Sequence, residues 1–302
     1  LIHMFYSKFV TVFIASMCLT GAVFAAPVKV VTISDDFSSI VQSIGGDHVA
    51  VTSLIAGSRN LHSINPKPSM VMMIKNADLL IRLGMAQDKW IDGLIHVAKN
   101  PNLFPGKQGY LDASKNIEKL EIPQGNIDAS MGDVHLYGNP HYWLNPANGI
   151  VIAKQIMDRL IAIDPDHAID YQARYRDFSL ELKAKIKVWK QRLEPYQKHN
   201  FVTYHKAWSY FFDGFNLRMV GELEPLPGIA PTTKHLVNLS KKLKQSNVPT
   251  VVLSTIYYPK KISQSFAKKQ GAKFVFVSSS VGSDGVTSYT ELFDYLVGAV
   301  TK

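Results

Sequence analysis

Short apolar, β-branched runs alternate with segments of helical periodicity along most of the chain. The first run, residues 28–33, is followed by residues 35–44, whose apolar positions recur at helical spacing before Gly45-Gly46. Further strands are predicted at 48–55, 78–83 and 109–112, and helices at 69–76 and 88–98. Strands that alternate with helices predict a parallel sheet covered by helices.

A long uninterrupted helix is predicted over residues 166–194. The segment contains no Pro or Gly, and Pro195 ends it. Its apolar positions recur at steps of four and three, at Tyr171, Tyr175, Phe178, Leu182, Ile186, Trp189 and Leu193. At 1.5 Å per residue this helix would be about 43 Å long, enough to run the length of a two-domain protein.

A second alternating series follows the long helix. Its predicted strands are 201–204, 217–220, 250–253 and 273–277, and its predicted helices are 206–212, 232–245, 259–269 and 288–300. The fold class is therefore α/β, with two βα lobes of parallel sheets flanked by helices and joined by one long rigid helix. The expected division is 27–165 for the first lobe, 166–195 for the linking helix and 196–302 for the second lobe. Ligands of such sheets bind at the carboxyl ends of the strands, so a site is expected in the cleft between the lobes.

Residues 1–26 are predicted to be a cleaved export signal. Lys8 precedes an apolar run, 9–19, and the small residues around 23–26 suit a cleavage site. The run is short for a membrane span. The only cysteine, Cys18, follows Met17, which is bulkier than the small residue that a lipid attachment site requires, so no lipid anchor is expected. We expect a periplasmic or otherwise extracytoplasmic protein whose mature form has no thiolate ligand.

The net charge of +9 does not by itself indicate a nucleic-acid partner. No stacking aromatic residues are interleaved with the short lysine pairs of the chain, which is typical of a solvated basic surface. Only short lysine pairs stand out, at 241–242, 260–261 and 268–269.

Three histidines occupy comparable positions, in a loop that opens a helix or just after a strand. His62 precedes Pro66, His141 follows Pro140, and His205 directly follows the run 201–204. Neutral imidazole is a good ligand for zinc and other borderline divalent metals, whereas manganese favours more oxygen. Each histidine alone is more typical of a packed residue, but together, at strand ends of two lobes, they predict a metal site.

Five stretches, three of which contain these histidines, resemble motifs of the metal-binding substrate-binding proteins of zinc and manganese ABC importers. They are 62–68 (HSINPKP), 76–81 (NADLLI), 139–146 (NPHYWLNP), 203–208 (TYHKAW) and 222–229 (ELEPLPGI). The resemblance covers essentially the whole mature chain in order. It implies two α/β lobes on a rigid linking helix, with metal held by His62, His141 and His205. Manganese members typically place Glu where His205 stands, so the three-histidine set favours zinc.

The fourth ligand departs from the family pattern. Ser279 stands where the family usually has Asp, and serine is a poor zinc ligand. The site is expected to hold three histidines and water, or to recruit Asp284. The loop 125–140 offers Asp128, Asp133 and His135 in place of the His-rich insertion of some zinc carriers. His135 is either an auxiliary ligand or a solvent-facing loop residue.

Other candidate residues have plainer interpretations. Glu222 and Glu224 form either a carboxylate pair or a fixed loop between the lobes. Trp143 and Trp208 are expected to form apolar walls that hold the imidazoles in place and limit access of water. Histidines expected to be structural or at the surface are His48, His96, His167, His199 and His235.

The sequence therefore predicts a zinc-capturing carrier that delivers Zn²⁺ to a membrane permease driven by a cytoplasmic ATPase. We expect a monomer that binds no nucleic acid and is not an enzyme. A Mn²⁺ or Fe²⁺ carrier of the same family and a zinc hydrolase are the alternatives, since three histidines and an open water position also describe catalytic zinc. No His-Glu-x-x-His helix or phosphate-binding loop is present, and no feature favours an adhesin.

Overall fold

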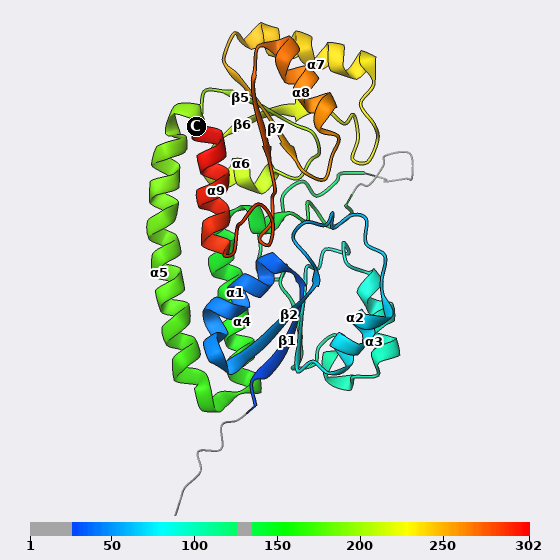
Figure 1. Ribbon diagram of the computed structural model, residues 1–302, viewed down its shortest axis with the longest axis vertical. Helices are drawn as coiled ribbons and strands as arrows, with labels where there is room; N and C mark the ends of the chain where they lie inside the picture. Colours follow the sequence, from blue (N-terminus) through cyan, green and yellow to red (C-terminus); the bar gives the residue numbers. More distant parts are fainter. Residues whose placement is uncertain (1–25, 126–134) are drawn as a thin grey trace, which may run out of the picture.

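The computed structural model describes residues 26–125 and 135–302 and contains two four-stranded parallel sheets (Figure 1). The first sheet has the order β2-β1-β3-β4. Its strands are β1 (Val28–Ser34), β2 (Val49–Ile55), β3 (Leu79–Arg82) and β4 (Tyr110–Asp112). The predicted α/β class and the parallel strand pairing are confirmed for this half of the chain.

Helices cover both faces of the first sheet. They are α1 (Asp35–Gly45), α2 (Pro68–Lys75), α3 (Trp90–Ala98) and α4 (Pro146–Ile163). Figure 1 shows α1 and α4 on the side of the long helix, and α2 and α3 on the other side. α4 begins at Pro146, because the Asn145 side chain accepts the N–H of Ala147 and proline suits the first helical position.

The second sheet has the order β6-β5-β7-β8 and is also parallel. Its strands are β5 (Asn200–Thr203), β6 (Arg218–Glu222), β7 (Thr250–Thr255) and β8 (Lys273–Val277). Its helices are α6 (Ser209–Phe215), α7 (Thr233–Ser246), α8 (Lys260–Gln270) and α9 (Tyr289–Thr301). α6 begins three residues later than predicted, because a tight turn, with the Ala207 N–H bonded to the His205 carbonyl, separates it from β5.

The long helix α5 (Ala168–Leu193) has 26 residues, which corresponds to about 39 Å. It is slightly shorter than predicted, because the prolines Pro165 and Pro195 place a short 3₁₀ turn at each end. Trp189 is fully buried near its C-terminal end and donates a 2.8 Å hydrogen bond to Asp294 of α9. α5 therefore joins the two lobes along one side of the molecule, as Figure 1 shows. No helix in the described part of the chain is long and apolar enough for a membrane span.

One large apolar core runs through both lobes. It includes Ile40 of α1, Trp189 of α5, and Val251 and Phe293 of the second lobe. A smaller cluster lies between the second sheet and its outer helices, α7 and α8. Because the larger core is continuous across the lobes, apolar burial opposes their separation.

Backbone and carboxylate groups also join the lobes at the end of β1. The Asp36 Oδ1 atom accepts the N–H of Val281 at 2.9 Å, and the carbonyl of Gly57 accepts the Tyr257 hydroxyl at 2.5 Å. Asp36 is fully buried, and this burial raises the pKa of its carboxyl from 3.8 to about 7. The carboxyl of Asp36, whose ionisation is disfavoured by burial, therefore lies at the contact between the lobes.

Asp36 is expected to make the metal-free protein less stable as pH rises. Between about pH 4 and 7 the folded protein retains a proton on Asp36 that the unfolded chain releases, so folding becomes less favourable toward pH 7. The full effect is at most about 4 kcal/mol. Urea unfolding of Asp36→Asn at pH 5 to 8 should show the variant gaining stability over wild type as pH rises. Exposed Asp47→Asn is the control. If the free energy of unfolding of Asp36→Asn and of wild type changed with pH in parallel, the raised pKa of Asp36 would be contradicted.

Candidate metal centre

Three loops at the carboxyl ends of strands bring His62, His141 and His205 together. His62 lies between β2 and α2, and His205 follows β5 by two residues. His141 directly precedes a 3₁₀ turn, Tyr142–Leu144, that leads into α4. The first two belong to the first lobe and the third belongs to the second lobe, so the three imidazoles meet between the lobes.

One nitrogen of each imidazole lies within 4.8 Å of the others. The Nε2 atoms of His62 and His141 are 3.1 Å apart. A tetrahedral zinc ion with Zn–N bonds of about 2.0–2.1 Å needs ligand nitrogens about 3.3 Å apart, so small adjustments would suit the ion. His141 and His205 are buried, and His62 is half-buried. Within the described residues, this gathering contains no carboxylate or thiol.

The Nδ1 atom of each histidine has a partner on the side away from the other imidazoles. The partners are Asn139 Oδ1 for His141 at 2.9 Å and Glu224 Oε2 for His205 at 2.7 Å. Because both oxygens accept, each of these Nδ1 atoms carries a proton, and in the neutral imidazole this leaves the lone pair on Nε2. The centre is therefore arranged to present imidazole lone pairs to a cation.

His62 is held by the amide of Gln87, whose Nε2 lies 3.2 Å from Nδ1 of His62. The amide oxygen and nitrogen exchange places by a half-turn, so the same contact can accept a proton from Nδ1. Gln87 follows β3 in a turn whose residues Gly84, Met85 and Ala86 all have positive φ angles of 78°, 50° and 62°. Such a conformation is unfavourable for Met and Ala, so other contacts must hold the turn.

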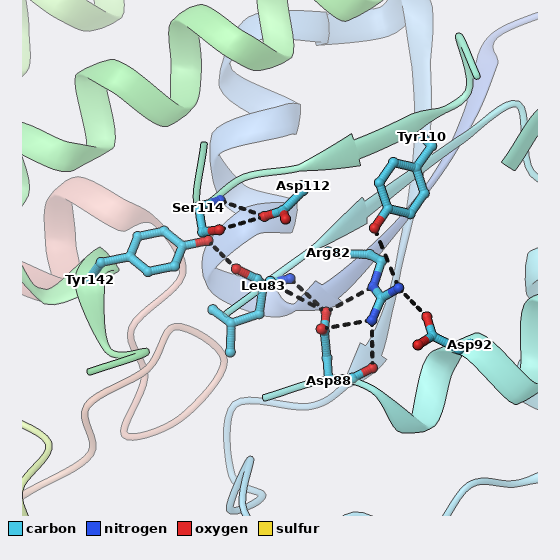
Figure 2. Close-up of polar contacts among 9 residues, drawn as sticks. Arg82, Leu83, Asp88, Asp92, Tyr110, Asp112, Ser114 and Tyr142 are labelled. Atoms are coloured by element: carbon cyan, nitrogen blue, oxygen red, sulfur yellow. Dashed lines mark hydrogen bonds and ion pairs between the residues drawn. The ribbon is translucent and has the colours of Figure 1, made fainter. Parts of the chain in front are cut away.

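A buried ion pair fixes this turn, as Figure 2 shows. Arg82 donates to Asp88 Oδ1 at 2.9 Å, and Asp88 Oδ2 accepts the backbone N–H of Leu83 at 2.9 Å. The hydroxyl of Tyr142 donates to the Leu83 carbonyl at 2.7 Å. Tyr142, the residue after His141, is thus hydrogen-bonded to the turn that carries Gln87. The positions of His62 and His141 therefore depend on the same turn.

Strand register accounts for the contact between His205 and Glu224. β5 and β6 are parallel neighbours, and the N–H of Glu224 donates to the Tyr204 carbonyl. The two residues therefore leave the sheet side by side. Glu224 also accepts the N–H of Gly228 at 3.3 Å, which agrees with its predicted role in fixing the loop.

The surroundings of His141 oppose its protonation. Burial, followed by the neighbouring imidazoles of His62, His205 and His135, lowers its pKa well below 6.5. A neutral imidazole can bind a cation without first losing a proton. The electrostatics of the pocket therefore suit a metal more than an imidazolium ion.

The residues considered for a fourth ligand lie in different settings. Ser279 lines a small cavity of about 20 Å³ beside His62 and His141, which is room for about one water molecule. Asp284 is exposed, and its Oδ2 accepts the Tyr295 hydroxyl at 2.6 Å and the N–H of Ser278 at 3.1 Å. Its carboxylate is therefore used within its own loop and is not part of the gathering.

His135 lies beside the three imidazoles. Its ring centroid is 5.4 Å from that of His62 and 6.4 Å from that of His141. It also lines a wider cavity of about 220 Å³ with His205 and Glu121. Asp128 and Asp133, from the same predicted loop, lie outside the described residues.

Aromatic rings enclose the centre, but only partly as predicted. The Trp143 ring lies 5.3 Å from His141, and its Nε1 donates to the Ser279 carbonyl across the lobes at 3.2 Å. Tyr258, and not Trp208, stacks on His205 with centroids 5.1 Å apart. Trp208 contacts Phe211 instead.

The remaining histidines that were expected to be structural have contacts elsewhere. His48 pairs with Asp170, His167 with Asp164, and His235 with the Glu222 carbonyl. The rings of His96 and His199 contact Phe104 and Tyr196 respectively.

Sequence reasoning did not identify the roles of Gln87 and Asn139. Asn139 had a usable signal, since an Asn two residues before a histidine can accept both its backbone and ring N–H groups, as it does here. Gln87 had none, because it is 25 residues from His62 and reaches it only through the fold.

Comparison with known proteins agrees with this architecture. The family model described as "ZnuA: Zinc-uptake complex component A periplasmic" matches residues 30–302. The iron-binding protein YfeA of Yersinia pestis is 25% identical over 285 aligned positions, and the match covers 91% of this chain and 85% of YfeA. The manganese ABC transporter substrate-binding lipoprotein PsaA of Streptococcus pneumoniae is 28% identical over 233 residues, covering 75% of this chain and 72% of PsaA.

Solved structures show the same fold. A crystal structure of ZnuA has a TM-score of 0.75 and 22% identity, and the match covers 91% of this chain and 98% of that one. A manganese-bound periplasmic metal-binding protein from Candidatus Liberibacter asiaticus has a TM-score of 0.74 at 20% identity, with the same coverage. The family model spans nearly all of the described chain and its two-lobed fold is shared. The chain therefore belongs to the ZnuA family of metal ABC transporter substrate-binding proteins.

Proposed function

We propose that this protein is the extracytoplasmic substrate-binding component of an ABC importer and captures Zn²⁺ through His62, His141 and His205. The observation that carries the proposal is the convergence of three imidazole nitrogens within 4.8 Å. The cargo would pass to a membrane permease driven by a cytoplasmic ATPase. The two lobes, 27–165 and 196–302, would hold the ion between them and be joined by the linking helix 166–195. Residues 1–26 would direct export of the protein.

The choice of zinc rests on the donor set. Imidazole nitrogen suits zinc, whereas carboxylate and water oxygens suit manganese. The relatives named above include an iron-binding protein and a manganese transporter component, so Mn²⁺ and Fe²⁺ are the competing cargoes. The lack of a carboxylate in the described gathering favours zinc over both.

The fourth position is proposed to hold water in the small cavity beside Ser279. The hydroxyl of Ser279 would contact that water and would not bind the ion, because neutral serine is a weak zinc ligand. His135 is proposed as an auxiliary imidazole that meets the ion on its way through the wider cavity. Asp284 is the least favoured of the three, because its carboxylate already bonds Tyr295 and Ser278.

Isothermal titration of the metal-free protein with Zn²⁺ and Mn²⁺ tests the proposal. We expect one Zn²⁺ per chain, with Mn²⁺ at least tenfold weaker, and little change in Ser279→Ala. Equal affinity for Mn²⁺ would reject the zinc assignment. The proposal gives the site no catalytic role, so ester hydrolysis by the zinc-loaded protein that disappears in His141→Ala would contradict it.

Gln87→Ala is expected to weaken zinc binding by about 10- to 100-fold, the usual range when the partner of a metal-binding histidine is removed. The physical reason is that His62, the least buried of the three histidines, would lose the contact that orients its ring. Competition with a chromogenic chelator gives the affinity. Exposed Gln191→Ala on α5 is the matched control, and equal affinities for the two variants would show that Gln87 does not orient His62.

A further inference from the structure

All of the net charge of this protein comes from one segment. Residues 225–283 contain nine lysines and no Asp, Glu or Arg. Removing these nine from the 33 basic residues leaves 24, which equals the number of acidic residues in the whole chain. The acids and bases are therefore balanced elsewhere, and the short lysine pairs are parts of one uncompensated stretch.

The fold gathers eight of these lysines on two neighbouring helices, α7 and α8. All eight are exposed: Lys234, Lys241, Lys242, Lys244, Lys260, Lys261, Lys268 and Lys269. The helices lie side by side, and Gln270 of α8 donates to Ser240 of α7 at 2.9 Å. Figure 1 shows them over the outer face of the second sheet, at the end of the molecule away from the first lobe.

No carboxylate in the described residues forms an ion pair with these eight lysines. Lys242 donates to the carbonyl of Val220, and Lys260 lies over the Phe276 ring. Positive charge is thus concentrated on the two outer helices of the second lobe, and none of it is paired with a carboxylate of the described residues. Such a concentration costs free energy through self-repulsion unless an anionic partner or salt offsets it.

An apolar groove of about 400 Å³ runs between the two helices. Leu236, Val237, Ile262 and Phe266 contribute apolar lining, and Lys261 also lines it. Val237 is 46% exposed, so part of the apolar lining of the groove is open to solvent. The basic face, defined as the eight lysines with this groove, therefore combines cationic and apolar surface.

We propose that the basic face docks on the surface of an anionic phospholipid membrane. Lysine ammonium groups would contact headgroup phosphates, and the groove would take apolar surface from the interfacial region. The charges are spread over two helices without a bidentate arginine, which suits a diffuse layer of charge better than one acidic protein site. The inference rests on the proposed function in one respect, since a carrier that delivers its cargo to a permease gains from lying at the membrane.

Vesicle sedimentation tests this surface directly. The full metal-free protein is mixed with vesicles of phosphatidylcholine containing about 30 mol% phosphatidylglycerol, or with phosphatidylcholine alone, at low and high salt. Each lysine near an anionic surface increases the membrane binding constant about fivefold. The variant Lys241→Gln, Lys244→Gln, Lys261→Gln, Lys269→Gln should therefore bind anionic vesicles at least tenfold more weakly than wild type. Binding should vanish on pure phosphatidylcholine and at high salt.

The matched control removes the same charge from exposed positions on or just after α5. It carries Lys183→Gln, Lys187→Gln, Lys190→Gln and Lys198→Gln. This control should bind anionic vesicles nearly as wild type does. Failure of wild type to bind them, or equal loss in both variants, would overturn the proposal. The proposal would also be overturned if the same lysines mediated binding only to vesicles of phosphatidylcholine that contain the permease. That result would identify a protein as the partner.

Zinc titration of the basic-face variant separates this inference from the proposed function. The variant should bind Zn²⁺ as wild type does, because its four substitutions lie outside the residues that line the imidazole cavities. Loss of vesicle binding with intact zinc binding supports the docking surface. Wild type that binds anionic vesicles but no zinc would reject the proposed function and leave the surface standing.

Discussion

His141→Ala is expected to reduce zinc affinity by at least about a hundredfold. Four-ligand zinc sites gain about 10–16 kcal/mol from metal binding, so one ligand corresponds to on the order of 3 kcal/mol. His141 is the most informative of the three to remove, because it is buried and Asn139 accepts both its backbone and ring N–H groups.

Calorimetric titration with chelator competition measures this loss. Circular dichroism and thermal unfolding of the metal-free variant show whether the fold is kept. The control is His96→Ala, which removes an exposed imidazole of α3. A zinc affinity of His141→Ala within threefold of wild type would mean that the three-histidine gathering does not hold the ion.

Gly57→Ala is expected to damage both stability and metal binding. A Cβ atom at this position would lie 1.6 Å from the carbonyl oxygen of Val281 in the other lobe. Backbone cannot move aside as a flexible side chain can, so the lobes would have to separate locally. Overpacking of this kind typically costs about 1–3 kcal/mol. His62, in the same loop, would then move relative to His205, and zinc affinity should fall.

Gly93→Ala provides the same chemical change in open space. A Cβ at this exposed position of α3 meets no atom within 4 Å, and alanine is favoured over glycine in helices by about 0.5–1 kcal/mol. Urea unfolding should therefore show opposite shifts for the two variants. Unchanged stability and zinc affinity in Gly57→Ala would show that the two lobes do not need this close approach.

The sequence was sufficient to predict the order and type of most elements. Alternation of apolar runs and helical periodicity predicted both parallel sheets, and the unbroken pattern from 166 to 194 predicted α5 to within two residues at each end. These features depend on local periodicity and on Pro and Gly. The start of α6 was missed because the turn after β5 is set by backbone bonds that helical periodicity does not report.

The sequence also placed the candidate ligands at strand ends, where parallel sheets gather side chains. It could not show which atoms orient them. Gln87 reaches His62 through a turn with positive φ angles that the Asp88 carboxylate holds in place. Glu224 reaches His205 through strand register. Such contacts join residues far apart in the chain, so no local pattern reveals them.

By itself, the sequence determined the α/β class, the long helix and three histidines in comparable loops. Only the tertiary structure decided that their nitrogens converge, that Asp284 lies apart from them, and that the two lysine-bearing helices lie side by side. The physical reason is the range of the interactions. Helix and strand formation depend on residues a few positions apart, whereas a site between lobes depends on register, packing and burial across the whole chain.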